Sequence, residues 1–383
     1  MPAPPPSGSA CTMAPLDGIT VIDFSTLLPG PLATLILAEA GATVLKVERP
    51  GTGEDMRAYP PAFGQDSVNF ALLNRAKRSI AIDLKAPGAV DRLLPLIDRA
   101  DVLVEQFRPG VMDRLGLGWE RLSARNPKLV YCAITGYGQS GPKAQVAGHD
   151  MNYMAETGLL ALAAGPDGAP VVPPALVADI AGGTYPAVIN ILLALAERQR
   201  SGTGRRLDIA MTDNLFTFMY WAMGDGMAGG AWPRPGGARV TGGSARYRIY
   251  RTRDGAYMAA APLEDRFWSI FCAVIDLPEA ARDDRADPEA SARAVAACIA
   301  TRTAAEWQAA FAGRDCCCNV VGSLQDAMAD PHFVGRGLFA RGLLDGMGNR
   351  MPALKTPVVP EMTATPAEAG YPALGEANGL LGD

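Results

Sequence analysis

Three side chains in the sequence have types suited to acid–base chemistry. His149 lies in AGHD, Asp179 in LVADIAGG and Glu264 in APLEDRF. Imidazole and carboxylate groups can take up or release a proton when their surroundings bring the pKa near neutral pH. Each also has a structural alternative. A single histidine is more often structural than catalytic, Asp179 precedes an apolar run and could cap a helix, and Glu264 could be an exposed acid that starts a helix.

The elements that would position these residues follow an alternating pattern. Strands are predicted in ITVIDF, TVLKVE, SIAIDL, DVLVEQF and LVYCAITG, and helices in PLATLILAEAG and PGAVDRLLPLIDRA between them. This order predicts an α/β fold with a Rossmann-like parallel sheet. Ligands on such sheets bind beyond the carboxyl ends of the strands. The segments to examine are therefore LLPGP, ERPGTGE, RPGV and GYGQSGPKAQVAGHD, the last of which contains His149.

The chain divides into a large and a small predicted domain. Residues 1–14 are expected to be a disordered leader rich in proline and small residues, and residues 15–225 the large Rossmann-like domain. The Gly/Pro-rich stretch GGAWPRPGGARVTGG marks the boundary. Residues 226–328 would form a small α+β domain that contains a hairpin in ARYRIYRTRDGAYMAAAP, and residues 329–383 would return to the large domain.

Composition argues against several classes of function. The net charge is −5 and no stretch combines clustered Lys and Arg with aromatics, so no nucleic-acid partner is expected. The apolar run around Ala187 to Ala196 is interrupted by Asn190 and followed by charged residues, which indicates a buried helix and no membrane span. A cytoplasmic location is the default expectation.

The sequence lacks motifs that are typical of several other classes of enzyme. No phosphate-loop or G-x-S-x-G pattern occurs, and no G-x-G-x-x-G pattern follows the first predicted strand, which argues against a nucleotide-dependent enzyme and a serine hydrolase. Seven cysteines without a C-x-x-C pair, and two histidines, predict neither a disulfide framework nor a metal site. The run Cys316 to Cys318 is interpreted as semi-buried thiols near a strand.

Eight motifs occur in an order that resembles one known family. They are VIDFSTLLPGP, ATVLKVERPGTGE, LNRAKRSIAIDLK, DVLVEQFRPGVMDRLGLG, GYGQSGP, AGHDMNY, LVADIAGG and ERQRSGTGRRLDIAM. Together they resemble the family III coenzyme A transferases of the CaiB/BaiF type, a group that includes the α-methylacyl-CoA racemase branch. The resemblance is specific from about Pro15 to Asp213 and thinner towards the C-terminus.

The resemblance implies a fold, a substrate and a partner. It implies a large domain assembled from both chain ends, an interlocked homodimer, and an acyl-CoA lying across the carboxyl edge of the sheet. No metal and no cofactor beyond the coenzyme A moiety of the substrate is implied. The coenzyme contacts that it implies are Arg49, Leu73, Asn74, Arg75, Lys77, Arg108, Arg114, Gly148, Asp150 and Tyr153.

The resemblance also implies catalytic roles. The combination of His149, Asp179 and Glu264 favours the racemase branch, in which two bases act on opposite faces of an enolate and a glutamate supports the histidine. Backbone N–H groups of the IAGG turn are expected to hold the enolate oxygen. In a coenzyme A transferase, Asp179 would instead be the nucleophile that forms an acyl anhydride and then a thioester. An acyl-CoA-binding protein without turnover is the third alternative.

Overall fold

The computed structural model describes residues 13–165 and 167–382, which form two compact units. The first unit holds the chain up to Tyr153, Ala175–Leu215 and the chain from Pro331 onward, and the second holds Met154–Pro174 and Phe216–Asp330. The chain therefore passes into the second unit at Phe216, ten residues before the expected boundary, and Met154–Pro174 also belongs there. Residues 1–12 of the expected leader lie outside the described residues.

A six-stranded parallel sheet forms the centre of the first unit. Its order is β5-β2-β1-β6-β7-β8, which in chain order is the 3-2-1-4-5-6 arrangement of a doubly wound fold. Val21 of β1 pairs with Val44 on one side and Val102 on the other. The strands are β1 (Thr20–Asp23), β2 (Thr43–Glu48), β5 (Arg78–Ala81), β6 (Val102–Glu105), β7 (Val130–Thr135) and β8 (Arg206–Ala210). The predicted α/β fold is confirmed.

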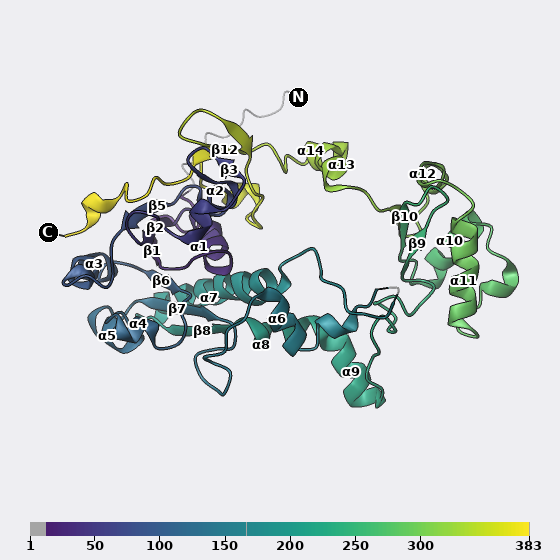
Figure 1. Cartoon of the computed structure of the whole chain (residues 1–383), viewed down its shortest axis with the longest axis horizontal. Coiled ribbons are helices and arrows are strands. Elements are labelled where there is room, and N and C mark those ends of the chain that lie inside the picture. Colours follow the sequence, from purple (N-terminus) through teal and green to yellow (C-terminus); the bar gives the residue numbers. More distant parts are fainter. Residues whose placement is uncertain (1–12, 166, 383) are drawn as a thin grey trace, which may run out of the picture. The chain divides into compact units, whose positions relative to one another are not determined.

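Helices cover both faces of this sheet, because successive side chains of a strand point to opposite sides. Apolar residues of one face, including Ile22, Leu45 and Leu103, pack in one core cluster with α3 (Ala89–Ile97), α4 (Val111–Arg114) and α5 (Trp119–Arg125). The opposite face meets α1 (Pro29–Glu39) and α7 (Tyr185–Ser201) (Figure 1). Burying each such aliphatic side chain contributes roughly 1.5–3 kcal/mol, so the sheet is fixed from both sides.

Shorter elements complete the first unit. After β2 come η1 (Asp55–Ala58), β3 (Ala62–Phe63), β4 (Asp66–Ser67) and α2 (Val68–Asn74), and around the later strands lie α6 (Asp150–Glu156), η3 (Ala178–Thr184) and α8 (Met211–Leu215). The C-terminal segment adds α14 (Pro331–Gly335), a small sheet of β12 (Gly342–Leu344), β13 (Arg350–Pro352) and β14 (Glu368–Gly370), and the turns η6 (Pro360–Met362) and η7 (Asn378–Leu380).

The C-terminal segment is bonded to the edge of the large sheet. The Ala377 N–H donates to the Ser79 carbonyl over 2.8 Å, and the Asn378 side chain accepts from the Ala81 N–H over 2.7 Å. Residues that come nearly 300 positions later in the chain are thus hydrogen-bonded to the edge strand β5. Both chain ends contribute to the first unit.

The helical stretch Ala178–Ser201 has the length and composition that a membrane crossing would require, with a mean hydropathy of 1.4, and half of that window is buried. Within the described residues it is the one helix with these properties. Core helices of water-soluble proteins share them, so this is weak evidence for a membrane span.

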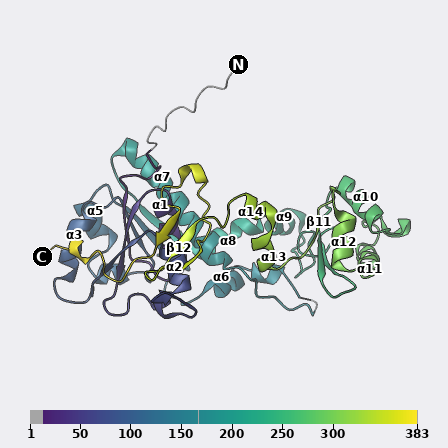
Figure 2. The same cartoon turned by 90° about the horizontal axis from the view of Figure 1, so that it is seen from above.

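The second unit is built on a three-stranded antiparallel sheet. The predicted hairpin is present as β9 (Arg248–Arg251) and β10 (Tyr257–Ala260), and β11 (Cys318–Val320) pairs with β10. Figure 2 shows the helices α10, α11 and α12 beside this sheet. The remaining elements are η2 (Leu160–Leu162), η4 (Phe216–Met219), α9 (Tyr220–Gly229), α10 (Asp265–Val274), η5 (Glu279–Ala281), α11 (Pro288–Ile299), α12 (Ala304–Phe311) and α13 (Leu324–Ala329).

Candidate active site

Two cavities of the first unit lie where the strand order reverses. β1 and β6 are neighbours, but the chain continues from β1 to β2 in one direction and from β6 to β7 in the other. The loops that leave such strands diverge and leave a crevice beyond the carboxyl ends. Thr26, which follows β1, and Phe107, which follows β6, line both cavities.

The first cavity has a volume of about 520 Å³ and contains both predicted bases, so we call it the His–Asp cavity. His149 comes from the loop that follows β7, and Asp179 comes from the first turn of η3. Arg108 and Tyr153 line the same space. The structure therefore brings His149 and Asp179 together from segments 30 residues apart.

Asp179 sits in surroundings that favour its protonated form. The pKa of its carboxyl is raised to about 6, chiefly by burial and also by the nearby Asp150, while His149 acts in the opposite direction. The Asp179 N–H donates to the Asp150 carboxylate over 2.9 Å, which fixes the backbone at this point. A carboxyl group with a pKa near neutral pH can both accept and return a proton under ordinary conditions.

The loop that carries His149 is fixed by α6. The His149 N–H donates to the Asn152 side chain over 3.0 Å, and the His149 carbonyl accepts from the Tyr153 N–H over 3.2 Å. The Tyr153 hydroxyl donates to the Gly148 carbonyl over 2.6 Å, and burial raises the pKa of Tyr153 to about 12. Tyr153 is therefore a neutral hydrogen-bond donor that holds the loop, and the imidazole of His149 stays exposed.

The segment that carries Asp179 is a π-helix, η3, which leads directly into α7. Such wide turns often occur at functional sites. A Cβ atom on Gly182 would lie 2.5 Å from the Met211 carbonyl oxygen, and one on Gly183 would lie 3.2 Å from Pro29. The two glycines therefore allow η3 to pack against α8 and the start of α1.

The expected oxyanion donors of the IAGG turn are partly engaged elsewhere. The Ile180 N–H donates to the Leu176 carbonyl over 3.1 Å, and the Asp179 N–H is bonded to Asp150. The Ile180 donor is therefore used in a bond to the residue four positions earlier, which lies before η3.

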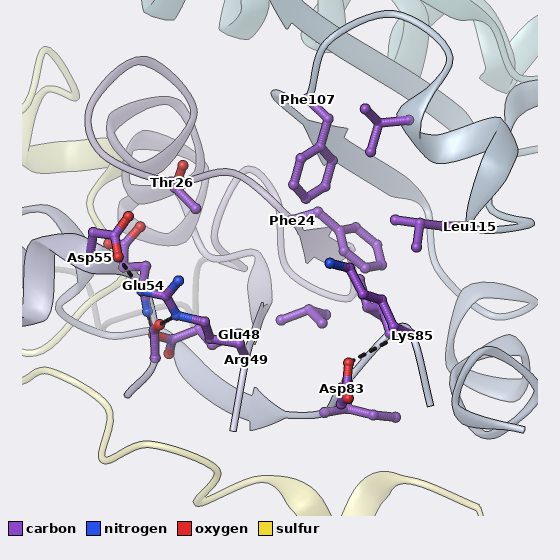
Figure 3. Close-up of a pocket in the computed structure, with 15 residues that line it drawn as sticks. Phe24, Thr26, Glu48, Arg49, Glu54, Asp55, Asp83, Lys85, Phe107 and Leu115 are labelled. Carbon is purple, nitrogen blue, oxygen red and sulfur yellow. Dashed lines mark hydrogen bonds and ion pairs between the residues drawn. The ribbon is translucent and has the colours of Figure 1, made fainter. Parts of the chain in front are cut away.

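The second cavity has a volume of about 440 Å³ and joins an apolar surface to two cations, so we call it the Arg49–Lys85 cavity (Figure 3). The apolar part includes Phe24 and Phe107. Arg49 is held by Thr52 and the Gly53 carbonyl over 2.9 and 2.6 Å and by an ion pair with Asp55. Aromatic rings suit a stacked base and fixed cations suit phosphate groups.

Comparisons with known proteins identify the family of the chain. The sequence pattern of CoA-transferase family III matches residues 16–378. The chain belongs to CoA-transferase family III. It is 35% identical to the human alpha-methylacyl-CoA racemase over 92% of this chain and 90% of that protein. It is also 35% identical to an acetyl-CoA:oxalate CoA-transferase of Acetobacter aceti, over 76% of this chain and 77% of that protein.

A solved structure shares the fold. A CAIB/BAIF family protein from Brucella suis superposes with a TM-score of 0.81 at 29% identity, covering 96% of this chain and 98% of that one. The suspected family is therefore confirmed, and this family III chain is an enzyme of the acyl-CoA type.

Some of the predicted coenzyme residues of this family III chain line a cavity, and the others do not. The residues that line one of the two cavities are Arg49, Arg108, Gly148 and Tyr153. Asp150 is buried, and its carboxylate accepts from the Asp179 N–H. Arg114 is exposed at the end of α4 and is not among the residues that line either cavity.

The segment Leu73–Lys77 is internal, which differs from the expectation. Lys77 Nζ lies 3.2 Å from the Asp23 carboxylate, Arg75 lies 2.9 Å from the Glu39 carboxylate, and Asn74 donates to a backbone carbonyl of its own helix. Leu73 is also buried. Because these side chains satisfy buried partners and line neither cavity, we do not carry them into the proposed coenzyme site.

Two residues were missed by the sequence reasoning. Lys85 follows β5 and lines the Arg49–Lys85 cavity, and Thr26 lies between the two cavities. The rule that ligands lie beyond strand ends would have indicated Lys85 if it had been applied to SIAIDLK as well as to the other strands.

Glu264 belongs to the second unit, at the residue that precedes α10. It is exposed and makes no side-chain capping hydrogen bond. Its expected support of His149 stays a prediction.

Proposed function

We propose that this family III enzyme racemises or epimerises the α-carbon of a 2-methylacyl-CoA thioester. The observation that carries the proposal is the pair formed by His149 and Asp179 in one cavity, with a carboxyl pKa of about 6. Inverting a carbon centre by proton transfer requires one base on each face of a planar intermediate. An imidazole and a weakly acidic carboxyl group are suited to those two positions.

In the proposed reaction, one of the two side chains removes the proton next to the thioester carbonyl. The electron pair of that C–H bond moves onto the carbonyl oxygen and gives an enolate. The other side chain, in its protonated form, returns a proton to the opposite face, and the enolate electrons re-form the carbonyl. Each turnover exchanges the protonation states of His149 and Asp179, so the reverse reaction uses the same residues in opposite roles.

The Arg49–Lys85 cavity would hold the nucleotide end of coenzyme A. Its aromatic residues could contact the adenine, and its two cations could pair with phosphate groups. Thr26 and Phe107 line both cavities, so the pantetheine arm would pass between them towards His149 and Asp179.

The second candidate function is coenzyme A transfer between an acyl-CoA and a carboxylic acid. The near-equal identity to the acetyl-CoA:oxalate CoA-transferase supports it. Asp179 would then attack the thioester carbonyl, form an acyl anhydride and release coenzyme A thiolate. The thiolate would attack the Asp179 carbonyl of the anhydride, release the donor acid and leave an Asp179 thioester of coenzyme A. The acceptor carboxylate would attack this thioester and form a second anhydride, and the released thiolate would attack the acceptor carbonyl to give the new acyl-CoA and free Asp179.

The deciding experiment is proton NMR of a 2-methylacyl-CoA incubated with the enzyme in deuterium oxide, with and without an added free carboxylic acid. The proposal expects that the α-proton signal is lost without added acid. In the His149→Ala variant the signal should persist. A new acyl-CoA that forms solely with added acid, without α-proton exchange, would establish the transferase and overturn the two-base assignment.

A further inference from the structure

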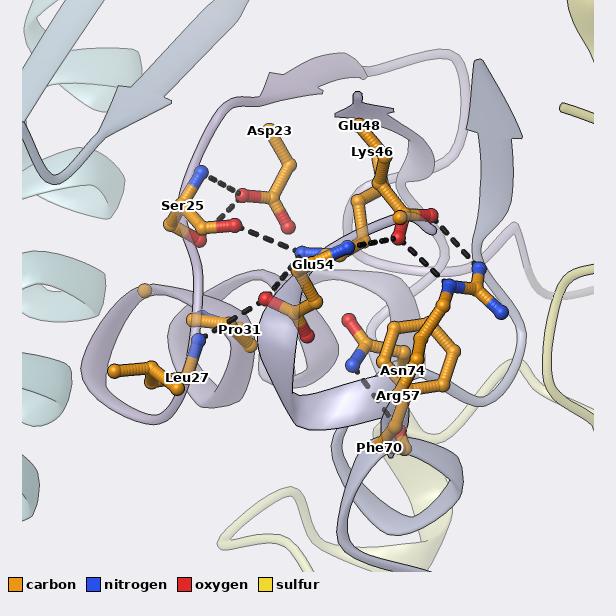
Figure 4. A network of polar contacts seen from close by, with 12 residues as sticks. Asp23, Ser25, Leu27, Pro31, Lys46, Glu48, Glu54, Arg57, Phe70 and Asn74 are labelled. Atoms are coloured by element: carbon orange, nitrogen blue, oxygen red, sulfur yellow. Dashed lines mark hydrogen bonds and ion pairs between the residues drawn. The ribbon is translucent and has the colours of Figure 1, made fainter. Parts of the chain in front are cut away.

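A buried ion pair lies under the loop that joins β1 to α1. Lys46 Nζ is 3.4 Å from the Glu54 carboxylate, and the two side chains are 0% and 1% exposed (Figure 4). Lys46 comes from β2, and Glu54 follows the turn after β2. Burial raises the pKa of Glu54, so this carboxyl is held in an environment that resists its charge.

The pair holds the loop by two backbone groups. Lys46 Nζ donates to the Ser25 carbonyl over 2.8 Å, and the Glu54 carboxylate accepts from the Leu27 N–H over 3.0 Å. Leu27 has a φ of 62°, a left-handed conformation that a leucine rarely adopts. Such a conformation persists where surrounding contacts impose it, and here the Glu54 bond does so.

The residue between these two attachment points borders both cavities. Thr26 is exposed and lines the His–Asp cavity as well as the Arg49–Lys85 cavity, and Leu27 lines the former. The turn from Ser25 to Leu27 is therefore the wall where the cavities adjoin. The position of this wall depends on Lys46, which lies behind it, and on Glu54, which also lines the Arg49–Lys85 cavity.

A buried ion pair is a poor device for stability alone. Removing two charges from water costs about as much as their attraction returns, and apolar replacements of similar size often fold equally well. The directed bonds to Ser25 and Leu27 are what an apolar pair could not supply. The loss of these two bonds therefore distinguishes a role of Lys46 and Glu54 in positioning the turn from a role in packing alone.

We propose that Glu54, together with Lys46, is a positioning residue for turnover at the His–Asp cavity. It acts by fixing the Ser25–Leu27 turn and touches no reacting atom. The inference rests on the proposed function, since it assigns the turn to the path of the bound acyl-CoA.

The test compares two double variants that both lack the charges of Lys46 and Glu54. They differ in whether residue 54 can accept a hydrogen bond from the Leu27 N–H. Lys46→Met with Glu54→Leu removes both attachments, whereas Lys46→Met with Glu54→Gln leaves an oxygen that can accept from the Leu27 N–H. Turnover is measured by whichever reaction the wild type shows, α-proton exchange or coenzyme A transfer. The leucine variant is expected to lose roughly 10- to 100-fold in kcat with a smaller change in KM, because a displaced wall misaligns the reacting groups.

The glutamine variant is expected to recover at least part of that loss at a similar Tm. Hydrogen exchange at the Leu27 amide is measured on the same proteins and should be faster in the leucine variant than in the glutamine variant. Glu39→Gln is the control, because it weakens a buried ion pair with Arg75 away from both cavities. It should lower Tm and leave kcat unchanged.

Equal kcat values in the two double variants, or wild-type kcat in the leucine variant, would overturn the inference. If the leucine variant does not fold, the glutamine variant, which keeps an acceptor for the Leu27 N–H, must lose less than about 10-fold in kcat relative to the wild type, and a larger fall overturns the inference as well. A wild type without either reaction would refute the proposed function, and amide exchange would then still decide whether Glu54 holds the turn.

Discussion

Asp179 connects the geometry of the site to a measurable pH dependence. Its pKa is raised to about 6, so it is a carboxylate above that pH and protonated below it. Removal of the α-proton by Asp179 should therefore fall as the pH decreases through about 6. Exchange from the stereoisomer that uses Asp179 as base should show this fall in a pH–rate profile measured by deuterium incorporation.

Asp150→Asn tests whether the charge of Asp150 contributes to the raised pKa of Asp179. It removes the neighbouring negative charge and keeps an oxygen for the Asp179 N–H, so the acidic limb should move to lower pH. Burial is the larger cause, and part of the elevation should remain. Asp98→Asn, at an exposed acid paired with Arg125, is the control and should not move the limb. A limb that stays in place in Asp150→Asn would contradict the assignment.

Lys85 gives a second prediction for a single residue. Lys85→Ala removes one of two cations from the Arg49–Lys85 cavity, so the Kd for adenosine 3′,5′-bisphosphate should rise by roughly 5- to 20-fold, less at high salt. Isothermal titration calorimetry measures the change. Lys128→Ala, at an exposed lysine outside this cavity, should bind like the wild type.

Five strands of the sheet were predictable because most of their residues are buried on both faces. A doubly buried strand is a short apolar run between turn residues, and all five predicted runs form strands of the sheet. The side-chain environment of the loop LNRAKRS could not be predicted in this way. Whether Lys77 faces solvent or the Asp23 carboxylate depends on a partner 54 residues away, which no local pattern reveals.

The π-helix η3 was also outside the reach of pattern reasoning. Asp179 was expected at a helix start, and the glycines that follow it resemble an ordinary turn. Their actual requirement is contact with α8, which a later part of the chain supplies. A helical segment whose geometry is imposed by its neighbour carries no periodic signal of its own.

Gly182→Ala tests that close contact. The added Cβ would lie 2.5 Å from the Met211 carbonyl oxygen, a backbone atom that cannot rotate away. The free energy of unfolding should fall by about 1–3 kcal/mol, with lower turnover because η3 carries Asp179. Gly335→Ala, where an added Cβ meets nothing within 4 Å, should change stability by less than about 0.5 kcal/mol. Chemical denaturation of both variants provides the comparison, and equal losses would contradict the packing argument.

For the whole molecule, we propose the homodimer that the family resemblance implies. The helix α7 exposes apolar side chains, among them Ile189 at 55% and Leu193 at 63% exposure, which water solvates poorly. Light scattering after size exclusion should give the mass of a dimer, and Leu193→Glu should shift it towards the monomer. Gln199→Glu adds the same charge at an exposed polar position of α7 and should leave the mass unchanged. A monomeric wild type at micromolar concentration would refute this proposal.

The bond between the C-terminal segment and β5 also has a consequence for protein synthesis. A ribosome releases β5 early, but the residues that pair with its outer edge, Ala377 and Asn378, are made almost 300 residues later. In between, the ribosome completes both segments of the second unit, Met154–Pro174 and Phe216–Asp330. The second unit can therefore fold on the nascent chain while the sheet of the first unit still has an unprotected edge strand, which is the kind of surface that aggregates and that chaperones bind.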